Sequence, residues 1–553
     1  MLKRSIVIPF VLCLAAWAFE VDVREAGPLG VRAVRDAAKG VKSAEISDAV
    51  RELYIDEGYL MAEVFVRPDS ARKRIAIEVD AGARAFVESF DVVGWEGDLP
   101  RMQTSTNKHF RRKDLALDMT SIVVELENSG FPFAVAKIET LNIGAPDNGK
   151  IPVRIAIGVE RGDSVAIGAV LVPNNTKTQV HVIQKTMLIR PPEIFSQRLI
   201  TAGVRRLNNL GYVRVVGEPE PVLDESGVWA LWVNFTEGRT VLIDGVFGYA
   251  PREGQSGLSG QIDATFDNIW GTGRQIKLNW KQSGDDFLRF STGYKEPFLF
   301  GGFGAMKLSA DYHDRGNSYT ERNFGAEYRY PLSFVFSVSL GGAIKSILPD
   351  SAGVARIPIS RQTRIDFGAH VEKLYPRVNP TSGWDASFTI SPVCVKRSGQ
   401  ALELLALDEF DAIARLEASI STALSFGRNF VLYERIVGRS VQLARELPLS
   451  DLYFLGGWGS LRGYREEQFS AEHIGWSNTE FRALLGGDAH GFAFFDAGAH
   501  KRYGEDAQLN VGYGIGLRLS TAIGRWTVAY GVAGGESLTD GMIHVGLSGR
   551  GDR

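Results

Sequence analysis

The stretch Leu455-Gly456-Gly457-Trp458-Gly459-Ser460-Leu461-Arg462-Gly463-Tyr464-Arg465 lies in the last fifth of the chain, inside a turn-rich interval between two strand-like runs. Its glycines let the backbone bend tightly and approach other groups closely. Arg462 stands among these small residues, and a guanidinium presents a rigid fork of donors that suits a buried carboxylate. A basic residue on a mobile surface loop is the ordinary interpretation of such a stretch. The rest of the sequence decides whether Arg462 pairs with a buried carboxylate or lies on a mobile surface loop.

The amino-terminal segment indicates export. Residues 1–18 combine a basic start, a short apolar run and a small-residue cleavage site, which is typical of a secretory signal peptide rather than of an interfacial anchor helix. The formal net charge of -3 gives no sign of a nucleic-acid partner. Cys394 is the only cysteine after this segment, so neither an intrachain disulfide nor a cysteine metal site is expected.

Residues 19–239 contain three copies of one pattern. Each copy has an amphipathic helix that ends at a glycine followed by an aromatic residue, then two alternating strands, then an acidic residue just before a glycine. Glycine suits the left-handed position that ends many helices. The pattern predicts three small α+β modules with boundaries 19–83, 84–162 and 163–239. Their helices are expected at 43–57, 114–129 and 193–210.

From residue 240 onward, helical periodicity gives way to about sixteen alternating segments of strand length. An even number of strands joined by short and long connections in alternation is typical of a bacterial outer-membrane barrel. A soluble sandwich or propeller would not explain that alternation. Residues 240–553 are therefore predicted to form a closed all-β transmembrane barrel of about 16 antiparallel strands. The long connection 445–474 is expected on its outer side.

The order of signal peptide, α+β repeats and barrel resembles the BamA/TamA superfamily of outer-membrane insertases and transporters, with a layout closest to TamA. The repeats resemble POTRA (polypeptide-transport-associated) domains. Five short motifs follow one another as in that superfamily: Phe266-Asp267-Asn268-Ile269-Trp270-Gly271-Thr272-Gly273, Tyr294-Lys295-Glu296-Pro297-Phe298, Leu461-Arg462-Gly463-Tyr464, Phe494-Phe495-Asp496-Ala497-Gly498 and Gly514-Ile515-Gly516-Leu517-Arg518.

This resemblance implies a role for Arg462. The sixth outer loop would fold back into the barrel lumen, where Arg462 would pair with Asp496 on the thirteenth strand, and Glu480 would be a second acceptor. The chain ends in Gly549-Arg550-Gly551-Asp552-Arg553, whereas most family members end on an aromatic residue. The structural and functional residues that the resemblance implies are Gly457, Leu461, Arg462, Gly463, Tyr464, Glu480, Phe495, Asp496 and Gly498.

The resemblance also implies a function. It predicts an outer-membrane protein with a periplasmic arm that captures unfolded client chains, which are outer-membrane or secreted proteins, and inserts or translocates them. Outer-membrane lipid and a periplasmic or inner-membrane accessory protein would be further partners. Exposed sheet edges of the modules could accept client strands; modules that serve only as spacers are the alternative. A two-partner-secretion transporter with one dedicated substrate also remains open, and a passive porin or adhesin is less favoured.

Catalytic and binding motifs are absent from the sequence. It contains no Gly-x-Ser-x-Gly elbow, P-loop, His-Glu-x-x-His or Cys-x-x-Cys pattern, and its eight histidines are scattered. No enzymatic activity, cofactor or metal ion is therefore expected.

Overall fold

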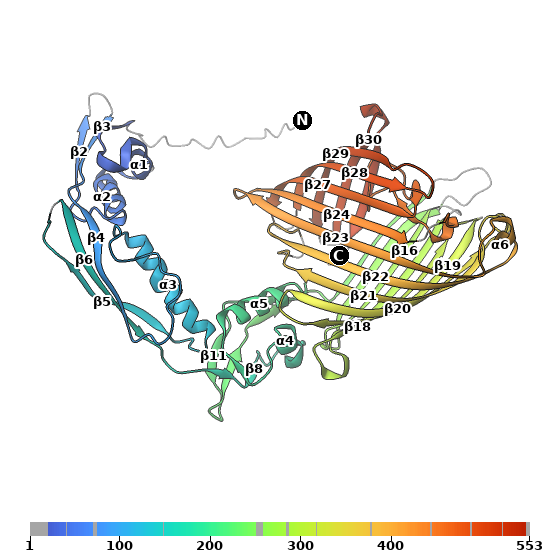
Figure 1. The fold of residues 1–553 in the computed structure, drawn as a ribbon, viewed down its shortest axis with the longest axis horizontal. Helices are drawn as coiled ribbons and strands as arrows, with labels where there is room; N and C mark the ends of the chain where they lie inside the picture. Colours follow the sequence, from blue (N-terminus) through green and yellow to red (C-terminus); the bar gives the residue numbers. More distant parts are fainter. Residues whose placement is uncertain are drawn as a thin grey trace, which may run out of the picture. The chain divides into compact units, whose positions relative to one another are not determined.

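A computed structural model describes the fold. The described residues form two compact units (Figure 1). The first runs to Ala166 and includes Ile194–Gln197, and the second holds Ile167–Glu193 and everything from Arg198 onward. The predicted signal peptide and the terminal residues 549–553 lie outside the described residues. Those residues are 20–39, 41–69, 74–147, 149–249, 258–283, 287–316, 318–376, 379–442, 445–486, 489–521 and 524–548.

The first unit contains two α+β modules. In the first module the strand order is β1-β3-β2, and in the second it is β4-β6-β5. Helix α2 buries Ile46, Val50 and Tyr54, which are spaced four residues apart and therefore share one face. The elements of the two modules are β1 (Glu20–Glu25), η1 (Gly27–Leu29), α1 (Gly30–Ala38), η2 (Ser43–Glu45), α2 (Ile46–Asp56), β2 (Glu63–Asp69), β3 (Arg74–Asp80), β4 (Arg84–Val93), α3 (Arg112–Asn128), β5 (Val135–Ile143) and β6 (Lys150–Glu160).

Most of the third module belongs to the second unit. Its helix α5 begins at Gln197, four residues later than the periodicity predicts, and buries Ile200, Gly203 and Leu207. The glycines after α2, α3 and the α5 region, Gly58, Gly130 and Gly211, have positive φ as expected. The elements are β7 (Ala166–Ile167), β8 (Ala169–Leu171), α4 (Val180–Thr186), β9 (Glu193–Ile194), α5 (Gln197–Asn208), β10 (Val213–Val215), β11 (Glu220–Leu223), β12 (Trp229–Trp232) and β13 (Phe235–Glu237).

The rest of the second unit is one antiparallel sheet of 16 strands, as predicted, and its strands curve round together (Figure 1). The strands are β14 (Val241–Tyr249), β15 (Leu258–Ile269), β16 (Arg274–Ser283), β17 (Phe287–Glu296), β18 (Ala305–Asp314), β19 (Tyr319–Pro331), β20 (Phe336–Pro349), β21 (Ile359–Glu372), β22 (Gly383–Ser398), β23 (Phe410–Phe426), β24 (Phe430–Gln442), β27 (His473–Gly486), β28 (Ala489–Lys501), β29 (Gln508–Thr521), β30 (Gly524–Ala533) and β31 (Met542–Ser548). Short helices η3 (Leu299–Gly301), α6 (Gln400–Leu404) and η5 (Leu538–Asp540) lie in its connections.

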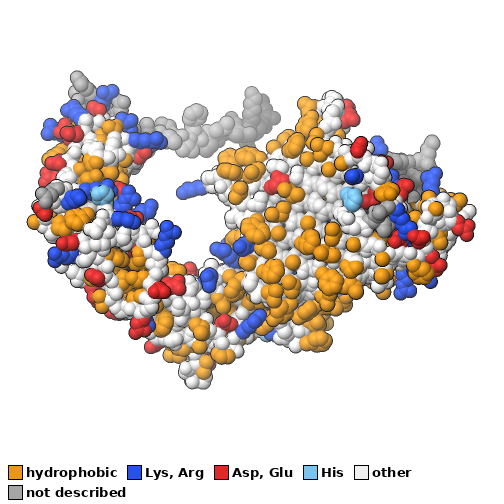
Figure 2. All heavy atoms as spheres, viewed as in Figure 1, with side chains coloured by type: hydrophobic (Ala, Val, Ile, Leu, Met, Phe, Trp, Pro, Cys, Tyr) orange, Lys and Arg blue, Asp and Glu red, His pale blue; other side chains and the backbone are white. Residues whose placement is uncertain are grey.

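The two faces of this sheet differ in chemistry. One face exposes large apolar side chains along successive strands, such as Phe324, Leu340, Phe367 and Ile436. Figure 2 shows the resulting apolar band. The opposite face carries charged and polar side chains, as the lumen of a membrane barrel does. No helix in the described ranges is long and apolar enough to cross a bilayer.

Closure of the sheet differs from the prediction. Among the described residues, no strand ladder joins β14 to β31, so the sheet has a seam between its first and last strands rather than a continuous ring of hydrogen bonds. Strand β31 pairs with β30 over seven residue pairs only, from Met542 to Ser548.

Candidate functional site

The connection between β24 and β27 folds inward as the resemblance implies. Its described part, residues 445–472, contains η4 (Leu449–Asp451) and a small hairpin formed by β25 (Tyr453–Leu455) and β26 (Phe469–Ala471). Leu455 and Leu461 are fully buried and pack with strand residues such as Ile474 and Trp476. A loop whose apolar side chains are buried this way is held against the lumenal face and is not a mobile surface loop.

Arg462 lies at the centre of a buried charge cluster. Its Nε and NH2 donate hydrogen bonds to the two carboxylate oxygens of Asp496 at 2.8 and 2.7 Å, and its NH1 donates to Glu480 at 2.7 Å. The backbone N–H of Arg462 also donates to Asp496, at 3.0 Å. Arg462 is 3% exposed and Asp496 is fully buried. The guanidinium therefore places its donor fork on two carboxylates that water does not reach.

A second arginine extends the cluster. Arg482 donates to the second oxygen of Glu480 at 2.8 Å, so two arginines face two carboxylates. The guanidinium carbon of Arg462 also lies 3.8 Å from the centre of the Phe494 ring, within range of a cation–π interaction. Buried ions stabilise a fold only when they are paired and hydrogen-bonded. The cluster meets that condition, so each member depends on the others.

Glycines let the loop backbone approach the strands. Gly463 has a φ of +93°, and a Cβ there would lie 2.7 Å from the backbone of Val532 on β30. A Cβ on Gly512 of β29 would lie 2.0 Å from the carbonyl oxygen of Arg462. A Cβ on Gly498 would press against Leu461, at 3.2 Å. Larger residues at these positions would push the loop away from the wall.

The loop also contacts the last strands. The N–H of Gly463 donates to Nε2 of His544 on β31 at 3.1 Å, and the hydroxyl of Tyr464 donates to the carbonyl of Val511 on β29 at 3.1 Å. Gly457 forms an isolated bridge with Leu461 that tightens the turn before Arg462. Thus the loop is bonded to several strands on one side of the sheet, including the strand next to the seam.

One predicted site residue lies elsewhere. Phe495 is 49% exposed on the apolar outer face, whereas Phe494, which the prediction passed over, lies under Arg462. The reason is the alternation of a strand: Phe494, Asp496 and Gly498 share one face, and Phe495 points to the other. The same alternation could have identified Phe494 from the sequence. Arg482 and His544 were also missed, because nothing local marks them as partners of the loop.

A second set of motif residues joins the third module to the barrel. The N–H of Gln179 donates to the carbonyl of Gly271 at 2.9 Å, and Asn268 donates to the hydroxyl of Thr178 at 2.8 Å. Thr178 in turn donates to Glu237 through its N–H and its hydroxyl, both at 2.6 Å. The turn within residues 266–273, the first of the five motifs, therefore binds the third module.

The electrostatics of this joint follow from its hydrogen bonds. Partial burial raises the pKa of Glu237, but the hydrogen bonds from Thr178 and Lys177 outweigh that effect and hold its pKa below the ordinary range. The carboxylate is thus the favoured form in the folded module, and its donor Thr178 is the residue that Asn268 of the barrel turn contacts. The second motif turn takes part through Phe298, whose ring lies 5.6 Å from the ammonium of Lys185 on α4.

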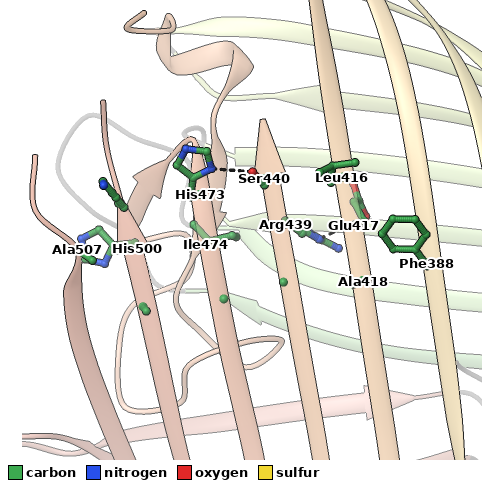
Figure 3. Close-up of a pocket in the computed structure, with 14 residues that line it drawn as sticks. Phe388, Leu416, Glu417, Ala418, Arg439, Ser440, His473, Ile474, His500 and Ala507 are labelled. Atoms are coloured by element: carbon green, nitrogen blue, oxygen red, sulfur yellow. Dashed lines mark hydrogen bonds and ion pairs between the residues drawn. The ribbon is translucent and has the colours of Figure 1, made fainter. Parts of the chain in front are cut away.

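A groove of about 400 Å³ crosses strands β22, β23, β24, β27 and β28 (Figure 3). Small residues such as Gly438, Gly475 and Ala499 leave space there, and Ser440 bonds to His473 at 2.7 Å beside it. Gly475 and Ala499 alternate with the residues of the arginine cluster, so they lie on the other face of the sheet. The groove is therefore separate from that cluster.

Comparisons with known proteins agree with this architecture. The family model of the Omp85 superfamily domain matches residues 268–549, and that of the surface antigen variable number repeat (POTRA) matches residues 165–238. A relative is the outer membrane protein assembly factor BamA of Neisseria meningitidis serogroup B (strain ATCC BAA-335 / MC58), which is 20% identical over 355 residues. That alignment covers 60% of this chain and 40% of the relative, so the chain spans less than half of that protein.

Two solved structures are similar to this chain at low sequence identity. CdiB from Escherichia coli has 13% sequence identity and a TM-score of 0.50, and the match covers 89% of this chain and 92% of that one. BamA from Haemophilus ducreyi lacking POTRA domains 1-3 has 17% identity and a TM-score of 0.46, and the match covers 80% of this chain and 94% of that one.

Proposed function

This chain belongs to the Omp85 superfamily, and from that premise we propose that it is an outer-membrane assembly factor. It lies in the outer membrane with its modules in the periplasm, captures unfolded client proteins and inserts or translocates them. The relative from Neisseria, named an outer membrane protein assembly factor, supports this choice. The chain spans only part of that relative. The capture of client proteins and the involvement of a periplasmic or inner-membrane accessory protein are therefore proposed for this chain.

The observation that carries the proposal is the open edge of the second module. Strand β5 lies at one edge of the sheet β4-β6-β5, and no strand among the described residues pairs with its other side. It is nine residues long, contains no proline and exposes four aliphatic side chains. These are Val135, Ile138, Leu141 and Ile143. Such an edge offers unpaired backbone groups to an extended chain and apolar contacts to its side chains.

The other module edges are poorer candidates. Strand β2 contains Pro68, and β11 contains Pro221, each of which lacks one backbone donor. Strands β7, β8, β9, β10 and β13 have only two or three residues each. Strand β1 exposes no large apolar side chain among the described residues, and β4 already bonds through Ala85 and Val87 to Gly58, Lys108 and Phe110. Client capture is therefore assigned to β5.

A charge placed on the edge tests this assignment. Lysine at an edge strand discourages pairing with another strand. The double substitution Ile138→Lys with Leu141→Lys should strongly reduce photo-crosslinking of an unfolded outer-membrane client to a probe at Thr140. The matched control is Leu117→Lys with Val124→Lys, which changes two equally exposed aliphatic residues on α3 of the same module. If both variants crosslink the client as efficiently as the wild-type protein does, β5 does not capture clients and the modules act as spacers.

Depletion in cells tests the wider function. Loss of the protein should lower the amounts of many outer-membrane β-barrel proteins, as measured by quantitative proteomics of isolated outer membranes. Loss of one secreted protein with an unchanged outer-membrane proteome would instead indicate a dedicated secretion transporter. No change in either would contradict both assembly and secretion.

A further inference from the structure

The sixth outer loop is bonded to the sheet at a second buried cluster, which the sequence did not indicate. Asp451, the last residue of η4, is fully buried. Its carboxylate accepts hydrogen bonds from Arg397 on β22 at 2.8 Å and from Gln362 on β21 at 2.5 Å. Its backbone carbonyl accepts one from Arg415 on β23 at 3.0 Å.

Neighbouring groups extend the cluster. Lys345 on β20 donates to the carbonyl of Ser450 at 3.1 Å. Arg397 is itself fully buried and also pairs with Asp411 on β23 at 2.9 Å. A buried guanidinium that faces two carboxylates has the same chemistry as the cluster around Arg462. The segment 449–451 is therefore held by four consecutive strands, β20 to β23.

The two clusters lie on different parts of the wall. Arg462 bonds to β27 and β28, and the residues that follow it contact β29 and β31. Asp451 bonds instead to β21, β22 and β23. Between the clusters the loop borders a cavity of about 470 Å³, which side chains from β17 to β27 also line. The loop thus joins two sets of strands across the lumen.

We propose that Asp451 is a second positioning residue of the sixth loop, which makes the loop a brace with two independent anchors. Because the two halves of the loop are covalently connected, the anchor that remains keeps the released half close to the sheet. Loss of one anchor therefore frees only the half of the loop that this anchor held. Arg462→Ala alone does not release the loop from the lumen. Release requires loss of both anchors.

Spin-label distances test the proposal, because they report position rather than stability. The full-length protein carries Cys394→Ser, since Cys394 is the free cysteine of the described chain. One label pair occupies 449 and 410 beside the first anchor, and the other occupies 465 and 501 beside the second. All four native residues are exposed.

Arg462→Ala should broaden the 465–501 distance distribution and leave 449–410 narrow, whereas Asp451→Ala should do the reverse. The double variant should broaden both, and only there should protease added from outside cut within residues 445–472. Broadening of both pairs by Arg462→Ala, or of neither by Asp451→Ala, would overturn the proposal.

A milder variant covers the case in which Asp451→Ala does not assemble. Asp451→Asn removes the charge that Arg397 pairs with but keeps an oxygen for Gln362, and it should still broaden the 449–410 distribution. The matched control is Asp408→Asn, which changes an exposed carboxylate paired with Arg445 and should leave both distributions narrow. Narrow distributions in Asp451→Asn would overturn the proposal as well.

Discussion

Replacement of Arg462 by alanine should destabilise the folded barrel by about 3–5 kcal/mol, the usual cost of removing one partner from a buried ion pair. The guanidinium makes three hydrogen bonds to Asp496 and Glu480. Without it, Asp496 keeps the backbone N–H of residue 462 as its one hydrogen-bond donor among the described residues. Glu480 keeps Arg482. Most of the cost therefore comes from the fully buried carboxylate of Asp496.

Lysine at the same position should recover only part of this loss. An ammonium keeps the charge but cannot bond both oxygens of Asp496 and reach Glu480 at once, because it lacks the planar fork. Hydrogen bonds to charged groups contribute about 1.5–3 kcal/mol, so Arg462→Lys should fall between wild type and Arg462→Ala. Arg462→Leu paired with Asp496→Leu should be less harmful than Arg462→Ala, since it leaves no uncompensated carboxylate at 496.

Urea titration of the detergent-solubilised protein measures this effect through the mobility difference between folded and unfolded barrel on unheated gels. The matched control is Arg502→Ala. Arg502 lies 3.6 Å from Glu446 in a largely exposed pair, which should contribute no more than about 1 kcal/mol. If Arg462→Ala changes the free energy of unfolding no more than Arg502→Ala does, the cluster is not a stabilising anchor and the reasoning fails.

Three further predictions concern the joint and the topology. Gly271→Ala should undock the third module and expose the segment before β14 to protease, because the new Cβ would lie 2.0 Å from the carbonyl oxygen of Lys177. Gly427 also has a positive φ but open space around it, so Gly427→Ala should not increase cleavage. Equal cleavage in both variants would count against docking through this turn. The lowered pKa of Glu237 comes from donors of its own module, Lys177 and Thr178, so it stabilises the folded third module above the unfolded pKa of about 4.3. This contribution is lost as the pH falls through the lower folded pKa, so proteolysis of the module should rise with acid in wild type but not in Glu237→Gln; an identical acid profile would contradict this. Protease added to intact cells should spare residues 20–239 until the outer membrane is permeabilised. Cleavage before permeabilisation would contradict a periplasmic location of these residues.

Local periodicity was enough to predict most secondary structure. The prediction of about sixteen strands from residue 240 onward matches the 16-stranded sheet, because two-residue alternation reports directly which side chains face lipid and which face the lumen. Helices ending at glycine and an aromatic residue were found for a similar reason. The residue that ends such a helix has a positive φ, which favours glycine, so a short stretch of sequence is enough to locate the helix end.

The candidate site was only partly predictable. The grouping of Arg462, Asp496 and Glu480 came from a resemblance, and strand alternation, had it been applied, would have exchanged Phe495 for Phe494. The seam between β14 and β31 depends on how far each strand extends along its neighbour. No window of sequence contains that information.

The second anchor was decided by the tertiary structure alone. Asp451 is one of several acidic residues in its loop, and its partner Arg397 lies 54 residues earlier in the chain. Neither residue carries a local signal, because a charged side chain at the end of a strand is usually exposed to solvent. Only the curvature of the sheet, which brings β20 to β23 against the inward-folded loop, buries both charges together. The sequence by itself determined the strands and the arginine at the loop's turn, whereas the curvature of the sheet around the inward-folded loop determined which charges meet.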